Sequence, residues 1–259
     1  MKILAASAIA PTYTHARALK LISDNASDPV AGKISIEEVQ LCPQHAGMIT
    51  EDLADRLTTH YPNTKFRLHA TPRIRGEHRH AVVYASNAHE HPEQMIATAA
   101  ISKRLKAPGY SIHAGVRGES TLSKAFDAVR RMSDQFQCRV GIEGLYPPSA
   151  RENHWLLSTW EEYRAMLDSG IDYALDLSHL NIVTKRERLM DIGLTTALIE
   201  SKQCMEIHIS DNNGRADSHR PMTVGEEPWW WDVLKSCRAE APVFYEGAIH
   251  LPKKARCAR

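Results

Sequence analysis

Nine side chains of the kinds that bind metal ions follow short apolar stretches along the 259-residue chain. All nine are histidines, aspartates or glutamates, and they are His69, His113, Glu143, Asp176, His179, His208, Asp217, His219 and Glu246. Imidazole nitrogen and carboxylate oxygen together suit zinc, manganese and Fe(II). Because no thiolate belongs to the set, an all-cysteine structural zinc site is not indicated.

Two of the carboxylates stand inside otherwise apolar runs. Glu143 lies in "VGIEGLY" and Glu246 lies in "VFYEGAI". Burying a lone carboxylate costs several kcal/mol unless it is paired or bound to a metal. Taken singly, a histidine in an apolar strand is more often a hydrogen-bonded core residue, and an acidic residue near a strand end is usually a cap. The runs "YALDLSH" and "EIHIS" add Asp176 and His208 in similar positions, and this joint placement favours a metal site.

The elements that must position these side chains alternate regularly between short apolar runs and longer amphipathic ones. The expected strands are 2–9, 33–41, 65–71, 109–115, 139–146, 172–180, 204–210 and 242–247. The expected helices are 14–25, 50–61, 92–107, 120–136, 158–170, 188–202 and 228–239. A repeat of about 30 residues in this order predicts an α/β fold, a single (β/α)8 TIM barrel. A doubly wound open sheet is the alternative, but no glycine-rich phosphate loop follows the first strand.

The barrel prediction covers residues 1–259 as a single domain. The last nine residues, "LPKKARCAR", are short and basic, so we expect the eighth helix to be short or absent. Two capping boxes are predicted to open helices, one at Ser158 and Glu161 and one at Thr184 and Glu187. In such a barrel the active site forms at the carboxyl ends of the strands, which is where the nine side chains fall.

Composition narrows the function classes. The 32 basic and 31 acidic residues give a net charge of +1, which is no whole-chain signature of nucleic-acid binding. Five cysteines without a CxxC pair indicate a reducing, cytoplasmic setting rather than a disulfide framework. No run approaches the ~18 apolar residues that a membrane span needs, so we expect no membrane association.

The pieces "LHA", "IHAG", "GIEG", "LDLSH", "IHISDNNG", "ADSH" and "YEG" resemble, in this order and spacing, the xylose-isomerase-like TIM-barrel superfamily. The resemblance runs from about His69 to Glu246. That superfamily holds sugar and sugar-phosphate isomerases and epimerases, and also an abasic-site endonuclease branch. This chain departs from the usual pattern at Gly144, where many members carry Asn, and at "HAG" in place of "HPG".

The resemblance implies two ligand sets. The simple isomerases use four ligands on one ion, which match Glu143, Asp176, His208 and Glu246. The endonuclease branch uses three metals, and all nine side chains have counterparts there. By that analogy His69, His113 and Glu143 serve one ion, the four isomerase ligands serve a second, and His179, Asp217 and His219 serve a third. We therefore expect about one to three divalent ions per chain, of Fe, Mn or Zn.

Three activities remain open. As an isomerase or epimerase, the enzyme would use Glu143 and Glu246 to move a proton on the substrate carbon. As a phosphoesterase of the abasic-site type it would hydrolyse a phosphoester, although the long DNA-contacting segments of the repair enzymes are missing. The segments "IEGLYPP" and "DSHRPM" are also similar to multinuclear iron enzymes that oxidise cysteine-containing peptides, often with a small partner protein.

Residues outside the ligand set suggest how a substrate is held. Arg73 and Arg75 lie in the basic stretch "RIRGEHRH" and could bind an anionic group, although a solvated loop is the favoured explanation. Trp229 opens "WWWDVLK" and could wall the pocket, and at least one of its three adjacent tryptophans should be exposed. We expect a small-molecule or peptide substrate rather than nucleic acid.

Overall fold

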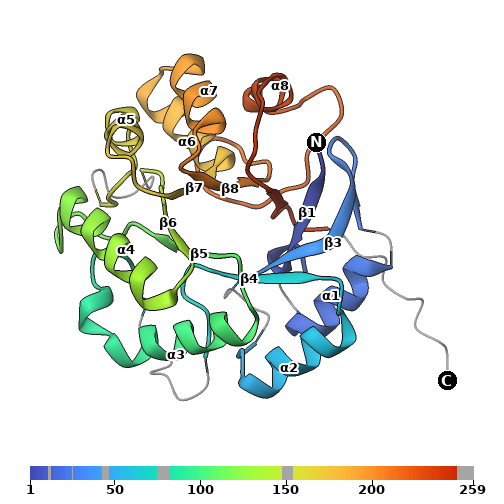
Figure 1. Cartoon of the computed structure of the whole chain (residues 1–259). Helices are drawn as coiled ribbons and strands as arrows, with labels where there is room; N and C mark the ends of the chain where they lie inside the picture. The colour runs from blue at the N-terminus through green and yellow to red at the C-terminus, as the bar shows by residue number, and fades with distance from the viewer. Residues whose placement is uncertain (11–12, 25, 43–46, 75–81, 148–153, 250–259) are drawn as a thin grey trace.

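The computed structural model describes residues 1–10, 13–24, 26–42, 47–74, 82–147 and 154–249. Its centre is a closed barrel of parallel strands (Figure 1). The strands are β1 (Ile3–Ala6), β3 (Gly32–Leu41), β4 (Lys65–His69), β5 (Gly109–His113), β6 (Arg139–Glu143), β7 (Tyr173–Asp176), β8 (Cys204–Ile209) and β9 (Val243–Tyr245). Because β1 pairs with both β3 and β9, the sheet closes on itself and the predicted (β/α)8 barrel is confirmed.

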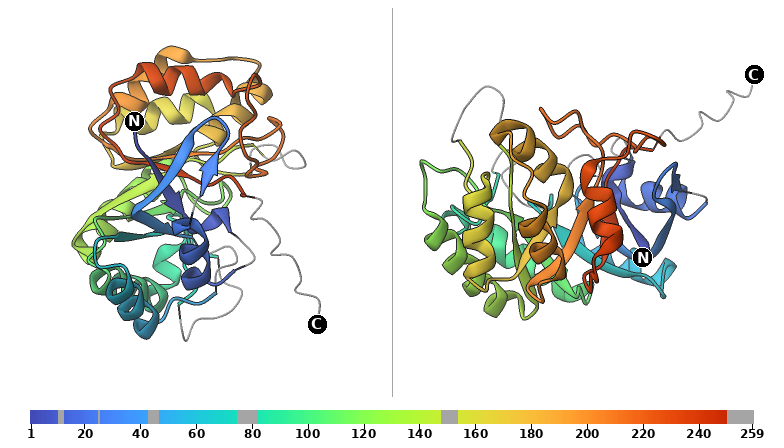
Figure 2. Two further views of the ribbon diagram at one scale, coloured as in Figure 1. Left: turned by 90° about the vertical axis from the view of Figure 1, so that its right-hand side faces the viewer. Right: turned by 90° about the horizontal axis from the view of Figure 1, so that it is seen from above.

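Helices cover the outside of the barrel, as Figures 1 and 2 show from three directions. They are α1 (His15–Ser23), α2 (Glu51–His60), α3 (Pro92–Arg104), α4 (Leu122–Phe136), α5 (Trp160–Asp168), α6 (Leu177–Glu187), α7 (Ile192–Glu200) and α8 (Trp229–Ser236). In α4, Phe126, Val129 and Phe136 are buried on one face, while the other face carries charged residues. The short elements are β2 (Ser27–Asp28), which pairs antiparallel with β3, η1 (Ser7–Ile9) and η2 (Ala88–Glu90).

The sixth repeat of the barrel differs from the prediction, which ran a strand through residues 172–180. β7 ends at Asp176 and α6 begins at the next residue. The cause is local, because Asp176 Oδ1 accepts hydrogen bonds from the backbone N–H groups of Ser178, at 2.7 Å, and His179, at 3.1 Å. This N-cap turns the chain into a helix and places His179 on its first turn.

Both capping boxes were predicted at the wrong residues. The N-cap of α5 is Thr159, whose side chain accepts from the backbone of Glu162, so that box lies one residue later than expected. Thr184 and Glu187 lie within α6, and α7 is capped instead by Asp191, which accepts from Leu194 N at 2.8 Å. The sequence carries several acceptors near each of these helix starts, and the structure uses Thr159 and Asp191.

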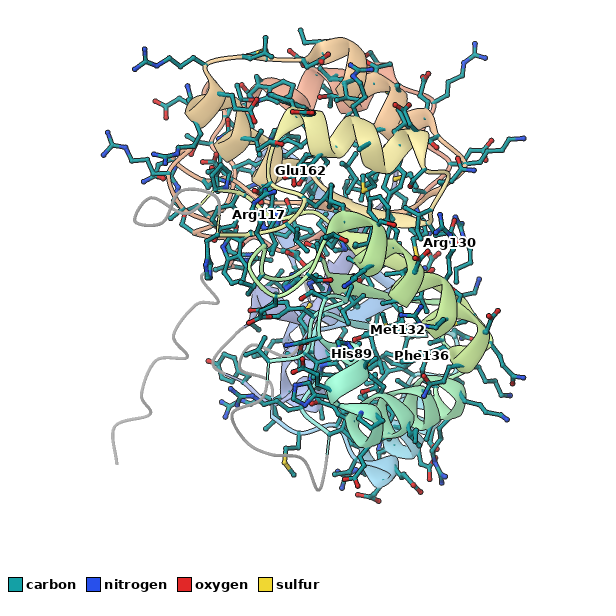
Figure 3. The ribbon with its side chains drawn as sticks, turned by 90° about the vertical axis from the view of Figure 1, so that its left-hand side faces the viewer. His89, Arg117, Arg130, Met132, Phe136 and Glu162 are labelled. Atoms are coloured by element: carbon teal, nitrogen blue, oxygen red, sulfur yellow. The ribbon has the colours of Figure 1, made fainter. Side chains whose placement is uncertain are left out.

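An ion pair joins the loop after β5 to the start of α5. Arg117 Nη1 lies 2.9 Å from Glu162 Oε1, and its guanidinium also donates to the carbonyl of Trp155 at 3.0 Å. Figure 3 places Arg117 beside Glu162, between the two helices that follow β5 and β6. The two loops at the carboxyl ends of these strands are therefore tied together.

The eighth helix was expected to be short or absent, and residues 250–259, where it would fall, lie outside the described residues. At least one of the three adjacent tryptophans was expected to be exposed. Instead, Trp230 and Trp231 are buried, and Trp229 is half-buried against the core. Among the helices of the described ranges, none is long and apolar enough to cross a bilayer.

Candidate metal centre

All nine predicted ligands lie among the described residues, and the structure brings them into one cluster at the carboxyl ends of the strands. Four strands end on a cluster residue: His69 on β4, His113 on β5, Glu143 on β6 and Asp176 on β7. His208 is the second-to-last residue of β8, and Glu246 directly follows β9. The barrel mouth, viewed along its axis in Figure 1, therefore collects side chains from six strands or the loops that follow them.

Glu143 is the hub of the cluster. Its Oε2 lies 3.3 Å from His69 Nδ1 and 3.6 Å from His113 Nε2. Its Oε1 lies 3.5 Å from His208 Nδ1 and 3.8 Å from His179 Nδ1. With 1% of its surface exposed, this carboxylate meets four imidazole rings in a setting from which water is excluded.

Glu246 forms a second hub, which also faces His208. Its Oε1 lies 3.9 Å from His208 Nδ1 and 4.0 Å from His69 Nε2, and its Oε2 lies 3.7 Å from His219 Nδ1. The Cys42 thiol, also buried, approaches Glu246 Oε1 at 4.0 Å. Nδ1 of His208 thus faces both Glu143 and Glu246.

The remaining side chains form a chain of imidazoles and carboxylates. Asp176 Oδ2 lies 3.3 Å from His179 Nε2, and Asp217 Oδ2 lies 3.4 Å from the same nitrogen. The same Asp217 oxygen lies 2.7 Å from His219 Nε2. His219 has a backbone φ of +44°, a conformation that a residue with a side chain seldom adopts. The loop after β8 therefore holds this ring in place at some cost in backbone strain.

The two hub carboxylates differ in their affinity for a proton. Burial alone would raise the pKa of Glu143, but His69 and His208 hold it well below its usual range. Burial raises the pKa of Glu246 to about 7, against the opposing pull of His208 and His219. Environment thus separates one ionised carboxylate from one that is partly protonated near neutral pH.

Acidic neighbours raise the pKa of the two imidazoles that contact Asp217. Burial alone would lower the pKa of His179, but Asp176 and Asp217 raise it to about 10. His219 behaves similarly, because Asp217 outweighs burial and raises its pKa to about 9. His69 and His113 behave in the opposite way, since burial dominates for both: it lowers the pKa of His69 to about 3 and holds the pKa of His113 below its usual value.

The donor set fits a divalent metal ion. Three buried atoms, Glu143 Oε2, His208 Nδ1 and His219 Nδ1, have no hydrogen-bond partner within the described ranges. Such atoms are rare unless something else binds them. Among the described residues, four groups of three histidines, aspartates or glutamates have candidate ligand atoms within 4.8 Å of one another; they include His69 with His113 and Glu143, and Asp176 with His208 and Glu246. The cluster therefore allows a divalent metal.

A second layer of polar side chains lies beneath the cluster, and the sequence analysis missed it. Arg67, Ser111 and Glu206 each precede a cluster histidine by two residues on the same strand and are buried. Ser111 Oγ lies 2.9 Å from His69 Nδ1. Since residues two apart on a strand face the same side, the alternation itself was the signal that could have found them.

Gly144 is one position at which this sequence departs from the pattern it resembles. Steric contact explains the glycine in this chain. A Cβ atom at this position would lie 2.3 Å from the hydroxyl oxygen of Tyr163. That hydroxyl donates to the carbonyl of Leu145 at 3.1 Å, and the carbonyl of Gly144 meets His179 Nδ1 at 2.8 Å. The side chain of Tyr163 thus occupies the space that a larger residue would need.

The positions of the predicted substrate-binding residues point less clearly to a function than those of the nine candidate ligands. Arg73 is exposed in the loop after β4, where its carbonyl accepts from Ile49 N at 2.5 Å. Arg75 lies outside the described residues. Trp229 is half-buried at the first position of α8, and its indole N–H has no partner within the described ranges. Their roles stay predictions.

Comparison with solved structures finds the same fold at low sequence identity. A D-tagatose 3-epimerase-like protein matches with a TM-score of 0.65 and 13% identity, over 96% of this chain and 92% of that chain. The IOLI protein with a bound zinc atom gives 0.63 and 13%, over 95% and 88%. An AP endonuclease of family 2 from Brucella melitensis gives 0.62 and 12%, over 96% and 94%. No family model and no curated protein matches the sequence.

Proposed function

We propose that this chain, which has the fold of the xylose isomerase-like TIM barrels, is a metal-dependent enzyme that isomerises or epimerises a sugar or sugar phosphate. One observation carries the proposal. Two buried carboxylates, Glu143 and Glu246, face the same unpartnered nitrogen of His208, at 3.5 and 3.9 Å from its Nδ1. Two carboxylates around one ligand position are what proton transfer on a metal-bound hydroxycarbonyl compound requires.

The residues divide into holding and reacting groups. Glu143, Asp176, His208 and Glu246 would hold the ion, which when bound supplies Lewis acidity toward carbonyl and hydroxyl oxygens. Glu143 and Glu246 would also remove and return the proton on the substrate carbon, one from each side. The epimerase-like structure and the zinc-containing structure among the solved neighbours are consistent with this assignment.

The centre we propose holds more than one ion. Asp217 and His219 are not needed by a mononuclear isomerase, yet both lie against the four-ligand set, His219 Nδ1 being 3.7 Å from Glu246 Oε2. His179 joins them through Asp217. Together with His69 and His113, these side chains offer enough donors for a second or third ion.

The proposal is tested by solvent exchange. The protein, loaded with Mn²⁺ or Zn²⁺, is incubated in D2O with a panel of ketoses and aldoses that begins with D-tagatose, and carbon-bound deuterium is followed by NMR. We expect deuterium at the carbon beside the carbonyl, lost in Glu143→Gln and Glu246→Gln. Exposed Glu119 offers a matched control, Glu119→Gln, which should keep full exchange. A loaded wild-type protein that exchanges no substrate proton contradicts the proposal.

The surplus ligands favour a second candidate, a multinuclear centre that carries out different chemistry. The trio of His179, Asp217 and His219 is compatible with a phosphoesterase or with an iron-dependent oxidase of a cysteine-containing peptide. Hydrolysis of an activated phosphodiester by the zinc-loaded protein would support the former. Thiol-dependent oxygen consumption by the iron-loaded protein would support the latter.

A further inference from the structure

The inner nitrogen of His208 lies in a small triangle of buried polar atoms. His208 Nε2 is 3.0 Å from Glu206 Oε1 and 2.9 Å from Gln40 Nε2. Gln40 Nε2 in turn is 2.8 Å from the same Glu206 oxygen. All three side chains are fully buried.

The donor and acceptor rules allow a simple solution of this triangle. An ionised carboxylate only accepts, so Glu206 Oε1 takes one hydrogen from the Gln40 amide and one from His208 Nε2. The close approach of Gln40 Nε2 to His208 Nε2 is then a contact between two donors to one acceptor, not a hydrogen bond. In this arrangement His208 carries hydrogen on Nε2, which leaves the Nδ1 lone pair for a ligand.

A buried arginine fixes the orientation and charge of Glu206. Arg67 Nη1 donates to the other carboxylate oxygen, Glu206 Oε2, in an ion pair whose two side chains are almost completely buried. Arg67 also binds Glu38, donating from Nε to Glu38 Oε1 at 2.6 Å. Glu206 is thus fastened on one side by a guanidinium and presents its remaining oxygen to the histidine.

We propose that Glu206 is a positioning residue that selects the metal-binding tautomer of His208 by accepting its Nε2 hydrogen. The inference rests on the proposed metal centre and deepens it. Glu206 does not touch the ion, but it orients the ring so that Nδ1 faces Glu143 and Glu246. Partners of this kind, behind a ligating histidine, set both ring orientation and ligand basicity.

The sharpest test is Glu206→Gln, because the new amide has two unlike ends. Arg67 needs an oxygen opposite its Nη1, so the amide NH2 must turn toward His208 Nε2. The ring can then only accept at Nε2, and its hydrogen moves to Nδ1, where it blocks ligation. We expect the affinity of the variant for Zn²⁺, measured by chelator competition, to fall by about 10- to 100-fold.

Glu38→Gln is the matched control, since it makes the same chemical change on the same arginine without touching His208. It should bind Zn²⁺ within about threefold of the wild type, a margin well below the loss expected for a histidine-orienting partner. Equal affinities of Glu206→Gln and wild type overturn the role of Glu206. A wild-type chain that binds no Zn²⁺ overturns the proposed centre itself, so the two failures are distinguishable.

Proton-detected 15N NMR of the zinc-loaded wild type gives a readout that does not depend on any variant folding. A His208 signal with hydrogen on Nε2 and none on Nδ1 is expected. Hydrogen on Nδ1 of His208 would overturn the proposal even if Glu206→Gln could not be purified.

Discussion

Asp176 and His179 are joined twice across the first turn of α6. Asp176 Oδ1 caps the helix by accepting the backbone N–H of His179, while Asp176 Oδ2 lies 3.3 Å from that residue's Nε2. One carboxylate therefore performs two tasks, with one oxygen committed to the backbone and the other to the cluster. The two tasks can be separated by substitution.

Asp176→Asn should keep the helix and lose the metal. The asparagine oxygen still accepts from Ser178 N and His179 N, so the free energy of unfolding of the metal-free protein keeps the contribution of the cap and loses only that of the charge beside His179. Asp176→Ala removes the cap as well and should lower that free energy by about 1 kcal/mol more. Urea denaturation of the metal-free variants, with Zn²⁺ titration alongside, measures both effects. Equal stabilities of the two variants would show that the cap contributes nothing.

Gly144→Ala should destabilise the fold by about 1 to 3 kcal/mol, the usual cost of forcing a group into a packed site. The new methyl group would overlap the ring and hydroxyl of Tyr163. Gly118→Ala is the matched control, because a Cβ there has open space around it. Chemical denaturation of both variants compares them, and a Gly144→Ala protein as stable as its control would refute the packing account.

The stability of the metal-free protein should fall in mild acid because of His15. This residue opens α1 and is completely buried, and burial lowers its pKa to about 4 from an ordinary value of 6.5. The unfolded chain therefore binds a proton that the folded chain refuses. The contribution of His15 is fully present above pH 6.5 and is lost as the pH falls toward 4, by up to about 1.4 kcal/mol per pH unit.

His15→Leu should remove that part of the pH dependence. Urea denaturation between pH 7 and pH 4.5 gives the slope for the wild type, for His15→Leu and for the exposed control His89→Leu. We expect the wild type and the control to share a steeper slope than His15→Leu. Three parallel slopes would rule out His15 as the source.

His219→Gly should lower the number of bound ions without straining the backbone. Glycine adopts the φ of +44° at this position freely, so the variant removes the ring and not the loop conformation. Elemental analysis after reconstitution with Zn²⁺ should show about one ion fewer per chain than the wild type. An unchanged ion count would place His219 outside the ligand set and favour a mononuclear centre.

Much of the fold was predictable because the barrel repeats one pattern. Alternating apolar and amphipathic runs located every parallel strand and most of the helices, and the rule about strand ends located the nine candidate ligands. The errors were local. At Asp176 the predicted strand ran on to residue 180 and α6 was not predicted, since a capping aspartate and a strand-end ligand look the same in sequence.

The layer beneath the cluster was not predicted because its partners are far apart in the chain. Glu206 looks like an isolated charge in "CMEIHIS" until Arg67, on β4, is brought against it. Gln40 adds a third strand to the same contact. Pattern along one strand shows which residues face inward, but only barrel closure shows which of them meet.

The metal centre depends on complete folding, because one of its carboxylates follows the last strand of the barrel. Glu246 follows β9, which is held between β1 and β8, so this carboxylate reaches His208 only when the last strand of the barrel is paired with β8. Any ion that binds the whole cluster would therefore distinguish a closed barrel from a chain whose final strand is still free. By mass action it would also hold the last strand to the rest of the sheet, which makes metal supply a determinant of how long the finished fold survives.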